Sequence, residues 1–311
     1  MNVMVTGGAG FIGSHIVDAM VESGAGVSVV DSLVSGMTEN LNTAASFHRL
    51  DIRDSSLDDV FKAERPDVVI HMAAQMDVRA SVADPVYDAD VNVVGSLNLL
   101  QCCIRHGVKR FVFASSGGAV YGEQETFPAA EDHPKRPLSP YGITKIAVEH
   151  YLYYYRAVHG LGYAALRFAN VYGPRQDPHG EAGVVAIFAG KMLDGETPMI
   201  NGDGGQTRDY VYVSDVVRAN VLAVHSQFVG SLNVGTGVEV SVNELYEKLK
   251  AATGYEGEVK HGPAKAGEQL RSVIDCGLIG RELGWSPRVA LEEGLMETVG
   301  FFRKRRTSVQ G

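Results

Sequence analysis

Short apolar runs alternate with longer helical patterns through the first half of the chain. The runs are rich in β-branched and aromatic residues and are bounded by Gly, Asp or Ser, as is typical of strands. They predict strands at 2–7, 26–31, 46–52, 67–74, 109–116 and 163–171. Apolar residues at helical spacing predict helices at 14–24, 91–107 and 139–160. Because several strands are apolar throughout, we expect an α/β fold with helices on both faces of a doubly wound parallel sheet.

The second half of the chain has longer loops and shorter predicted elements. Long Gly- and Pro-rich connections at 173–183, 201–210 and 260–272 separate shorter elements. Loops of that length within a folded chain are usually binding loops. We therefore place the larger domain at 1–172 and a smaller α/β domain, which binds the substrate, at 173–311. The run SLNVGTG at 231–237 is expected to return to the main sheet as a further strand.

The totals narrow the functional class. With 311 residues, of which 45% are hydrophobic and 21% charged, the composition is that of a globular protein with a full core. The net charge of −9 argues against nucleic acid as a partner, and the basic run at 303–306 is typical of a solvated helix end. The three cysteines, Cys102, Cys103 and Cys276, offer neither a paired framework nor a CxxC motif. Without an apolar run of membrane-spanning length or a basic leader, we expect a cytoplasmic protein with reduced thiols and no membrane partner.

The stretch TGGAGFIG follows the first strand and opens the first helix, which predicts a dinucleotide-binding, Rossmann-type fold. Its spaced glycines, which allow a tight turn and a close approach of backbone N–H groups to a pyrophosphate, are Gly7, Gly10 and Gly13. Asp31 ends the second strand, where a carboxylate would bind the ribose hydroxyls and repel a 2′-phosphate, so NAD is favoured over NADP. The alternative is an Asp that caps the following turn. Asp51 and Ile52 are candidates to bracket the adenine, with an ordinary loop acid as the alternative.

A tyrosine and a lysine lie one turn apart in the third helix. That helix is expected to begin with Ser139 as its N-cap and Pro140 at its first position. Tyr141 and Lys145 then share one face at i and i+4. A cation at ~4 Å and an effective dielectric of ~20 contributes ~4 kcal/mol, so Lys145 is expected to lower the tyrosine pKa by up to about three units. Such a phenolate could remove a proton from a sugar hydroxyl while hydride leaves for NAD.

These features occur in the order of a known family. The residues that carry the resemblance are TGGAGFIG, Asp31, HMAAQ, Asn92, SSGGAVYG, SPYGITK, RFANVYGPRQ and QTRDYVYVSDV. Over nearly its whole length the chain resembles the extended short-chain dehydrogenase/reductase family, and within it the UDP-glucose 4-epimerases and their nucleotide-sugar relatives. The resemblance implies an enzyme that holds NAD tightly and inverts a UDP-hexose, UDP-glucose or UDP-galactose, at C4 through a transient 4-keto sugar.

The resemblance also implies roles for single residues. Tyr141 would be the base, Lys145 its partner on the nicotinamide ribose, and Asn92 a support for the catalytic helix. The further cofactor-binding residues that we expect are Phe11, Ile12, Ser32, Ser35, Gly36, Ala73, Ala74, Gln75 and Ser115. The substrate-binding residues that we expect beside Tyr141 are Ser116, Gly117, Asn170, Val184, Arg208, Tyr210, Glu268 and Arg271. An arginine fork suits a diphosphate. Lys265 and Glu268 stand where relatives more often have Arg and Asp, so surface charge is the alternative for both.

The strand end ASSGGAVYG bears on the reaction. Dehydratases and decarboxylases that resemble this chain carry acids immediately before V-Y-G, where this sequence has Gly118 and Ala119, so epimerisation is favoured. The hydroxyl that assists the tyrosine in many epimerases is replaced here by Gly117. Ser116, which we include among the catalytic residues, or a water is expected to take its place. On this basis Gly117→Ser is predicted to be tolerated.

Several alternatives stay open at this stage. Ser272 stands where some glucose-specific relatives have a bulky tyrosine, so a UDP-N-acetylhexosamine or UDP-glucuronate 4-epimerase is the second possibility. A non-catalytic NAD-binding sensor is the third, because a fold does not determine a function. Apolar and tyrosine-rich positions in the helices around 89–107 and 143–160 favour a homodimer, although HYLYYY at 150–155 could instead pack within one subunit.

The loop DPHGEAG at 177–183 does not predict a metal site. Asp177, His179 and Glu181 alternate along it, but a second histidine at ligand spacing is missing. We therefore expect no metal and assign this loop to the substrate side.

Overall fold

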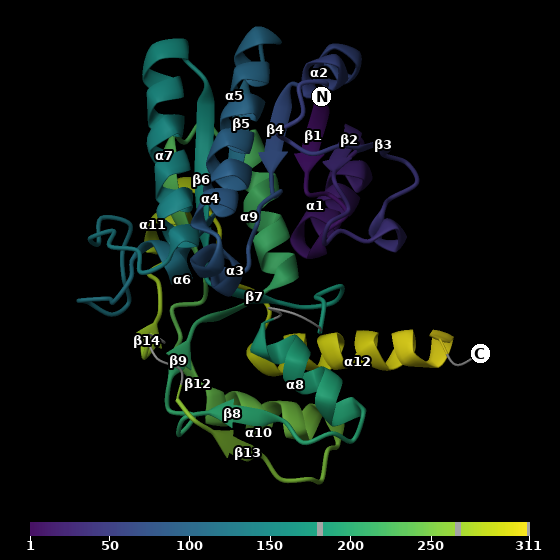
Figure 1. Ribbon diagram of the computed structural model, residues 1–311, viewed down its shortest axis with the longest axis vertical. Helices are drawn as coiled ribbons and strands as arrows, with labels where there is room; N and C mark the ends of the chain where they lie inside the picture. The colour runs from purple at the N-terminus through teal and green to yellow at the C-terminus, as the bar shows by residue number, and fades with distance from the viewer. Residues whose placement is uncertain (179–182, 265–268, 310–311) are drawn as a thin grey trace.

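The computed structural model describes residues 1–178, 183–264 and 269–309. Its main feature is a seven-stranded, entirely parallel sheet in the order β11-β6-β5-β4-β1-β2-β3 (Figure 1). The strands are β1 (Asn2–Thr6), β2 (Gly26–Asp31), β3 (Ser46–Arg49), β4 (Val68–His71), β5 (Arg110–Ser116), β6 (Gly162–Phe168) and β11 (Gly230–Val234). This order, which reverses between β1 and β4, is that of a Rossmann-type, doubly wound α/β fold, and the predicted fold class is confirmed.

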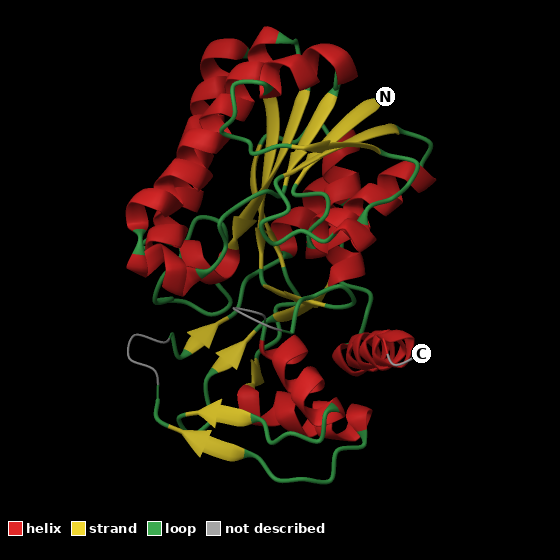
Figure 2. Ribbon diagram, turned by 45° about the vertical axis from the view of Figure 1, so that its right-hand side comes forward, coloured by secondary structure: helices red, strands yellow, loops and turns green. Residues whose placement is uncertain are grey.

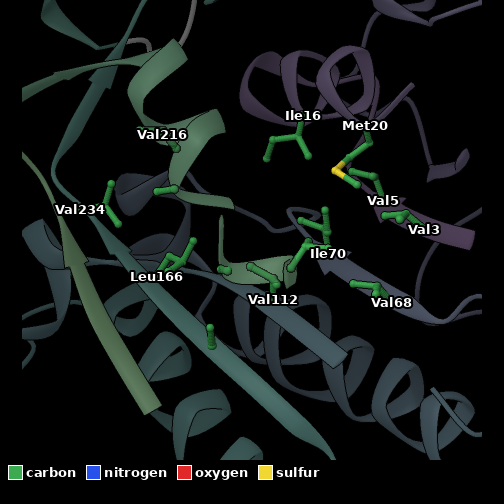
Figure 3. Packing of buried hydrophobic residues seen from close by; sticks show 14 of the residues in the cluster. Val3, Val5, Ile16, Met20, Val68, Ile70, Val112, Leu166, Val216 and Val234 are labelled. Atoms are coloured by element: carbon green, nitrogen blue, oxygen red, sulfur yellow. The ribbon is translucent and has the colours of Figure 1, made fainter. Parts of the chain in front are cut away.

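Helices cover both faces of this sheet. One face carries α1 (Phe11–Glu22), α9 (Val213–His225) and α11 (Gly277–Leu283). The other carries α2 (Leu57–Glu64), α5 (Gly95–Arg105) and α7 (Pro140–His159). Alternate residues of β1 show why both faces must be covered: Val3 and Val5 pack against α1 in the cluster drawn in Figure 3, whereas Met4 packs under α2 and α5.

Helix α7 begins and ends where its sequence signals indicate. The Ser139 hydroxyl accepts a hydrogen bond of 3.1 Å from the backbone N–H of Gly142, and Pro140 is the first helical residue. Gly160 ends the helix in the left-handed conformation, with φ of 75°. The expected N-cap is therefore confirmed, and it fixes where Tyr141 and Lys145 fall in the first two turns.

Two predicted elements differ from the structure. The apolar run at 163–171 is divided, because the chain leaves the sheet at Ala169 and continues as β7 (Asn170–Tyr172), which pairs with β10 (Tyr210–Tyr212) instead. The expected helix at 91–107 begins with a π-helical turn, η2 (Asp90–Val94), before α5. Short helical turns fill the remaining connections: η1 (Thr38–Asn40), α3 (Val78–Ala83), α4 (Pro85–Ala89) and α6 (Gly117–Val120).

A second, smaller group of elements lies beyond the carboxyl ends of the sheet strands (Figures 1 and 2). Its strands are β8 (Met199–Asn201) paired with β13 (Lys260–Gly262), and β9 (Thr207–Arg208) between β12 (Val240–Ser241) and β14 (Arg271–Ser272). Its helices are α8 (Val184–Leu193), α10 (Val242–Thr253) and α12 (Leu291–Val309), which share one apolar core. The C-terminal half of the chain thus serves both groups, since α9, β11 and α11 pack on the large sheet. None of the helices within the described residues is both long and apolar enough to cross a bilayer.

Candidate active site

The glycine-rich turn between β1 and α1 fits the close approach that a dinucleotide needs. Gly7 has φ of 70°, and a Cβ there would lie 2.6 Å from the backbone N of Ala73. A Cβ on Gly13 would lie 2.1 Å from the Gly7 carbonyl oxygen. Glycine is therefore required at both positions. The turn leaves the first N–H groups of α1, at Phe11 and Ile12, at the positive end of the helix.

Asp31 holds this turn together. One carboxylate oxygen accepts a hydrogen bond of 2.9 Å from the Ala9 N–H, and the other accepts one of 2.8 Å from the Leu33 N–H. The capping alternative is therefore realised. It is compatible with ribose binding, because each oxygen has a further lone pair. Gly36 lies against the same carboxylate, and the loop after β2 also holds Ser32 and the exposed Ser35.

The acid expected at the adenine is paired with an arginine. Asp51 accepts two hydrogen bonds from the Arg53 guanidinium, at 2.9 and 2.7 Å, and Arg53 also donates to Asp90 at 2.7 Å. The hydrogen bond from Arg53 is the main reason that the pKa of Asp51 lies below its ordinary value. Ile52 is buried, and its carbonyl accepts a hydrogen bond from Asn98. The Asp51 and Ile52 backbone is thus held firmly next to η2.

Asn92 lies in the π-helical turn at the centre of a buried polar cluster. Its side-chain oxygen Oδ1 accepts a hydrogen bond of 2.8 Å from the backbone N–H of Gln75. Its side-chain nitrogen Nδ2 donates to the backbone carbonyl of Gln75 at 2.9 Å and to the Asp88 carboxylate at 3.0 Å. Asp88 also accepts from the Thr144 hydroxyl at 3.1 Å. Ala73 and Ala74 precede Gln75 on the same loop after β4. The cluster therefore joins that loop to α7 at Thr144, one residue before Lys145. The π-turn is also a feature that often marks functional sites.

Tyr141 and Lys145 lie together at the carboxyl end of β5. The Lys145 Nζ is 4.8 Å from the centre of the Phe113 ring and 5.4 Å from that of the Tyr141 ring. Lys145 is 3% exposed. Burial lowers its pKa to about 8, against the opposing carboxylates of Asp88 and Glu149.

The electrostatics of the tyrosine differ from the sequence-based expectation. Burial, followed by the negative charge of Asp88, raises the pKa of the Tyr141 phenol above its ordinary value. The i, i+4 spacing brings the positive charge of Lys145 close to the ring, but the loss of water around the ring is the larger effect. The chain alone therefore keeps Tyr141 as a neutral phenol at neutral pH, and a further positive charge is needed to make it a base.

Two adjacent serines at the end of β5 have different surroundings. The Ser115 hydroxyl donates a hydrogen bond of 2.6 Å to Glu149, which forms a buried ion pair of 2.6 Å with Arg167. The Ser115 side chain is thereby committed to the packing of α7 on the sheet. Ser116 stands at the N-cap of α6, and its side chain makes no capping hydrogen bond. Its hydroxyl is therefore the one that this strand end offers to a ligand.

Gly117 is constrained more tightly than the sequence indicates. A Cβ on Gly117 would lie 2.9 Å from Cδ1 and 3.1 Å from Cγ2 of Ile274, a side chain that is 1% exposed. The structure adds a condition to the expectation that Gly117→Ser is tolerated, because Cδ1 at the end of the Ile274 side chain must shift to admit the serine. Gly118 faces Asn170 instead, whose Oδ1 would be 3.8 Å from an added Cβ.

The two arginines expected at the diphosphate are brought to neighbouring strands. Arg208 in β9 pairs with Ser272 in β14, and Arg271 is the preceding residue of that strand. Arg271 donates two hydrogen bonds to Glu239, at 2.9 and 2.7 Å, and stacks 3.7 Å from the centre of the Phe127 ring. Glu239 also accepts from the Thr207 hydroxyl at 2.7 Å. An acid that the sequence did not single out thus stands beside the proposed phosphate-binding groups.

The other expected substrate residues fall in different surroundings. Tyr210 is 5% exposed within the core of the smaller group, and its strand pairs it with Asn170. Val184 is the first residue of α8. Lys265 and Glu268 lie outside the described residues, as do His179 and Glu181. Over the described ranges, no three His, Cys, Asp or Glu side chains gather as metal ligands would.

Asp209 is a supporting residue that sequence reasoning missed. It is 1% exposed between Arg208 and Tyr210, and its carboxylate accepts hydrogen bonds from the Thr236 N–H and hydroxyl, at 2.8 and 2.6 Å, and from the Gly237 N–H at 3.0 Å. It therefore ties the arginine-bearing strand to the loop after β11. Its position inside TRDY is the sequence signal that could have indicated it.

The fold and the glycine-rich turn together define a dinucleotide-binding protein of the Rossmann class. Residues 3–235 match the model of the NAD dependent epimerase/dehydratase family. The chain belongs to this family.

Individual relatives agree over the whole length of the chain. A UDP-glucose 4-epimerase of Mycolicibacterium smegmatis is 47% identical over 311 residues, with 98% of this chain and 99% of the relative covered. The crystal structure of a UDP-glucose 4-epimerase of Thermotoga maritima with UDP-glucose has a TM-score of 0.97 at 51% identity, covering 98% of this chain and 100% of that one. The UDP-glucose 4-epimerase of Thermus thermophilus in complex with NAD has a TM-score of 0.93 at 47% identity, covering 97% and 99%.

Proposed function

We propose that this protein is a UDP-hexose 4-epimerase that uses NAD and interconverts UDP-glucose and UDP-galactose. The observation that carries the proposal is the pair of Tyr141 and buried Lys145 at the carboxyl edge of the sheet, beside a glycine turn of the kind that lets a dinucleotide approach the backbone closely. The relatives of high identity support it, since they are named as UDP-glucose 4-epimerases and their structures hold UDP-glucose or NAD.

The chain's residues would share the work as follows. Gly7, Gly13 and the start of α1 would hold the pyrophosphate of NAD, and Asp31 the adenosine ribose. Bound NAD supplies the acceptor and later the donor of the hydride at C4, and its cationic ring adds a positive charge beside the phenol. Lys145 and that charge together would offset the burial that raises the pKa of Tyr141.

Tyr141 would take the proton of the C4 hydroxyl as the 4-keto sugar forms and return it as the alcohol is restored on the other face. Ser116 would donate a hydrogen bond to the same oxygen. Arg208 and Arg271 would anchor the diphosphate, because a guanidinium fork matches its oxygens. The hexose is then free to turn while the nucleotide stays in place. Gly118 and Ala119 supply no acid, so the keto sugar has no group here to drive dehydration.

The first test is turnover of three sugars by the protein as purified. UDP-galactose, UDP-N-acetylgalactosamine and UDP-galacturonate would be compared by chromatography of the products, and NAD released on denaturation would be quantified. We expect UDP-glucose from UDP-galactose, near-stoichiometric NAD, and a loss of turnover by orders of magnitude in Tyr141→Phe with NAD retained. No product from any sugar, or wild-type turnover in Tyr141→Phe, would contradict the proposal. A preference for an N-acetylated sugar would redirect it, since Ser272 is small and buried at the site.

A homodimer is the assembly that we propose. Helix α7 exposes an apolar face with Ile143, Tyr151, Tyr154 and Val158, which are 56%, 39%, 49% and 59% exposed. Exposed apolar groups of this extent on one helix favour burial against a second copy of the chain.

The three cysteines are unpaired, which supports our expectation that the protein works in a reducing cytoplasm.

A further inference from the structure

Asp88 is a buried carboxylate that the proposed chemistry does not yet use. It lies in α4 and is 0% exposed. One oxygen accepts from the Gln75 side chain at 2.9 Å and from Asn92 at 3.0 Å, and the other accepts from the Thr144 hydroxyl at 3.1 Å. Its partners come from the loop after β4, from η2 and from α7. A single side chain therefore closes the three segments that surround the expected nicotinamide end of the cofactor site.

The Thr144 hydroxyl carries this clamp to the proposed base. Thr144 Oγ1 lies 2.9 Å from the carbonyl oxygen of Tyr141, and the Tyr141 N–H donates to the Ser81 hydroxyl at 3.3 Å. The single hydroxyl proton of Thr144 can go either to Asp88 or to the Tyr141 carbonyl, so Asp88 and the backbone of Tyr141 share this one donor. A displacement of Asp88 would be transmitted directly to the first turn of α7.

The negative charge of Asp88 also acts on Lys145. Among the charges near Lys145, Glu149 is already neutralised by its buried ion pair with Arg167. His71, behind Lys145 on β4, is kept neutral because burial and the Lys145 charge lower its pKa to about 3. Asp88 therefore provides the largest favourable electrostatic contribution to the Lys145 ammonium. Burial raises the pKa of Asp88 itself, while Thr144, Gln75 and Lys145 favour its ionised form.

We propose that Asp88 is a positioning residue for the Tyr141–Lys145 pair, which clamps Gln75, Asn92 and Thr144 into one cluster and supplies the buried negative charge opposite Lys145. The inference rests on the proposed role of Tyr141 as the base. The function of Asp88 is to hold Lys145 as an ammonium inside an apolar site. Its negative charge also keeps the Tyr141 phenolate, once formed, basic enough to remove a hydroxyl proton.

Asp88→Asn separates the charge from the clamp. The amide oxygen of Asn can still accept from Gln75 and Asn92, and its NH₂ can donate to Thr144 Oγ1, whose own proton then goes to the Tyr141 carbonyl. Each hydrogen bond keeps a partner while the negative charge is lost. The matched control is Asp90→Asn, the same change two residues later, because Asp90 is 48% exposed and pairs with Arg53.

The readout is the pH titration of Tyr141 in the NAD-loaded protein as purified. The ultraviolet difference spectrum of tyrosinate would be recorded against the matching Tyr141→Phe protein, so that the other twelve of the 13 tyrosines cancel. At pH values where Lys145 keeps its proton, we expect the loss of the like charge in Asp88→Asn to move the Tyr141 titration to lower pH by about one unit. Both limbs of the pH profile of kcat should move in the same direction, since Lys145 would lose its proton earlier. Asp90→Asn should titrate as the wild type does.

Coinciding titrations of Asp88→Asn and wild type would overturn the inference, as would an equal shift in Asp90→Asn. Should Asp88→Asn lose NAD on purification, Asp88→Ser removes the same charge in a smaller side chain, and the same direction of shift is expected. The titration requires no sugar turnover. A shift without epimerisation of any sugar would therefore uphold the electrostatic role and reject the proposed reaction, whereas epimerisation with an unshifted titration would reject the role of Asp88 alone.

Discussion

Gly117 and Ile274 are in such close contact that a single added carbon on the glycine would lie 2.9 Å from the isoleucine Cδ1. The backbone of Ile274 pairs with Ala129 in an isolated bridge, and the residue is 1% exposed. The missing hydroxyl at position 117 is thus matched by a filled space rather than an open one. The residue type at position 117 and that at position 274 therefore constrain each other, and neither sequence segment reveals this by itself.

This contact makes Gly117→Ser a sensitive substitution. We expect it to lower the free energy of unfolding by about 1–3 kcal/mol, as overpacking of a close-packed site does. Adding Ile274→Val removes Cδ1 and should restore most of that loss, although Ile274→Val alone destabilises by about 1 kcal/mol. Urea unfolding of the two single variants and the double variant measures the coupling. Additive effects of the two changes would show that the contact is not limiting.

The two serines of the same strand end should respond differently to alanine. Ser116→Ala is expected to lower kcat by about tenfold or more with little change in stability, because its hydroxyl has no capping role. Ser115→Ala should instead reduce stability by about 1–3 kcal/mol, since Glu149 would lose a buried donor. Steady-state kinetics and thermal unfolding of both variants distinguish these outcomes. Unchanged turnover in Ser116→Ala would remove Ser116 from the mechanism and leave a water as the helper.

Most of the fold could be predicted from local sequence signals. The capped start of α7, the continuous apolar strands and the glycine turn are each encoded within a few neighbouring residues. The division of 163–171 into β6 and β7 was not, because both halves are apolar and the pairing of β7 with β10 depends on a segment about 40 residues later. A continuous apolar run carries no mark of where its partner strand changes.

The site could be predicted from the sequence where its residues form a contiguous motif. It could not be predicted where the residues come from distant segments. Tyr141 and Lys145 share a helix, so their proximity follows from helical geometry. Two partners of Asp88, Gln75 and Thr144, lie 13 residues before it and 56 residues after it. Glu239 contacts Arg271 across 32 residues. Desolvation of Tyr141 likewise depends on the packed surroundings, which the i, i+4 spacing does not contain.

Lys145 should make the stability of the protein depend on pH. Its pKa falls from the ordinary 10.5 to about 8 on folding, chiefly through burial. At about 1.4 kcal/mol for each pKa unit, the buried charge costs about 3 kcal/mol. This cost is complete below pH 8 and disappears as pH rises to 10.5, since the folded chain loses its proton first. Stability from this group thus increases with pH within that window.

Lys145→Met offers a direct measurement of this cost. In protein freed of NAD, we expect the variant to be inactive yet more stable than the wild type near pH 7, with the difference shrinking toward about pH 10. Urea unfolding at both pH values measures it, and the comparison with wild type cancels the titration of other groups. A stability difference that does not change with pH would show that Lys145 is not desolvated as its 3% exposure indicates.

The exposed face of α7 should determine the oligomeric state. Tyr154→Glu and Val158→Glu place a carboxylate in the surface that we assign to the second subunit, and burying it unpaired is unfavourable. We expect the wild type to sediment as a dimer and both variants to shift toward monomer at the same concentration. Met296→Glu, at a position on α12 that is 60% exposed, is the matched control and should remain dimeric. A monomeric wild type in analytical ultracentrifugation would refute the assignment.

Glu239 should lower the affinity of the protein for its nucleotide. Its carboxylate accepts hydrogen bonds from Nε and Nη2 of Arg271, and its negative charge lies where a diphosphate would bring more. In Glu239→Gln an amide oxygen can still orient the guanidinium, but the repulsion is gone, so UDP should bind a few times more tightly. Because the groups are partly exposed, the gain should diminish as salt is added. Calorimetric titration with UDP at low and high ionic strength measures both effects, with Glu247→Gln on the exposed side of α10 as control. Weaker binding in Glu239→Gln would mean that the acid chiefly holds Arg271 in place, and that its competition with the diphosphate is minor.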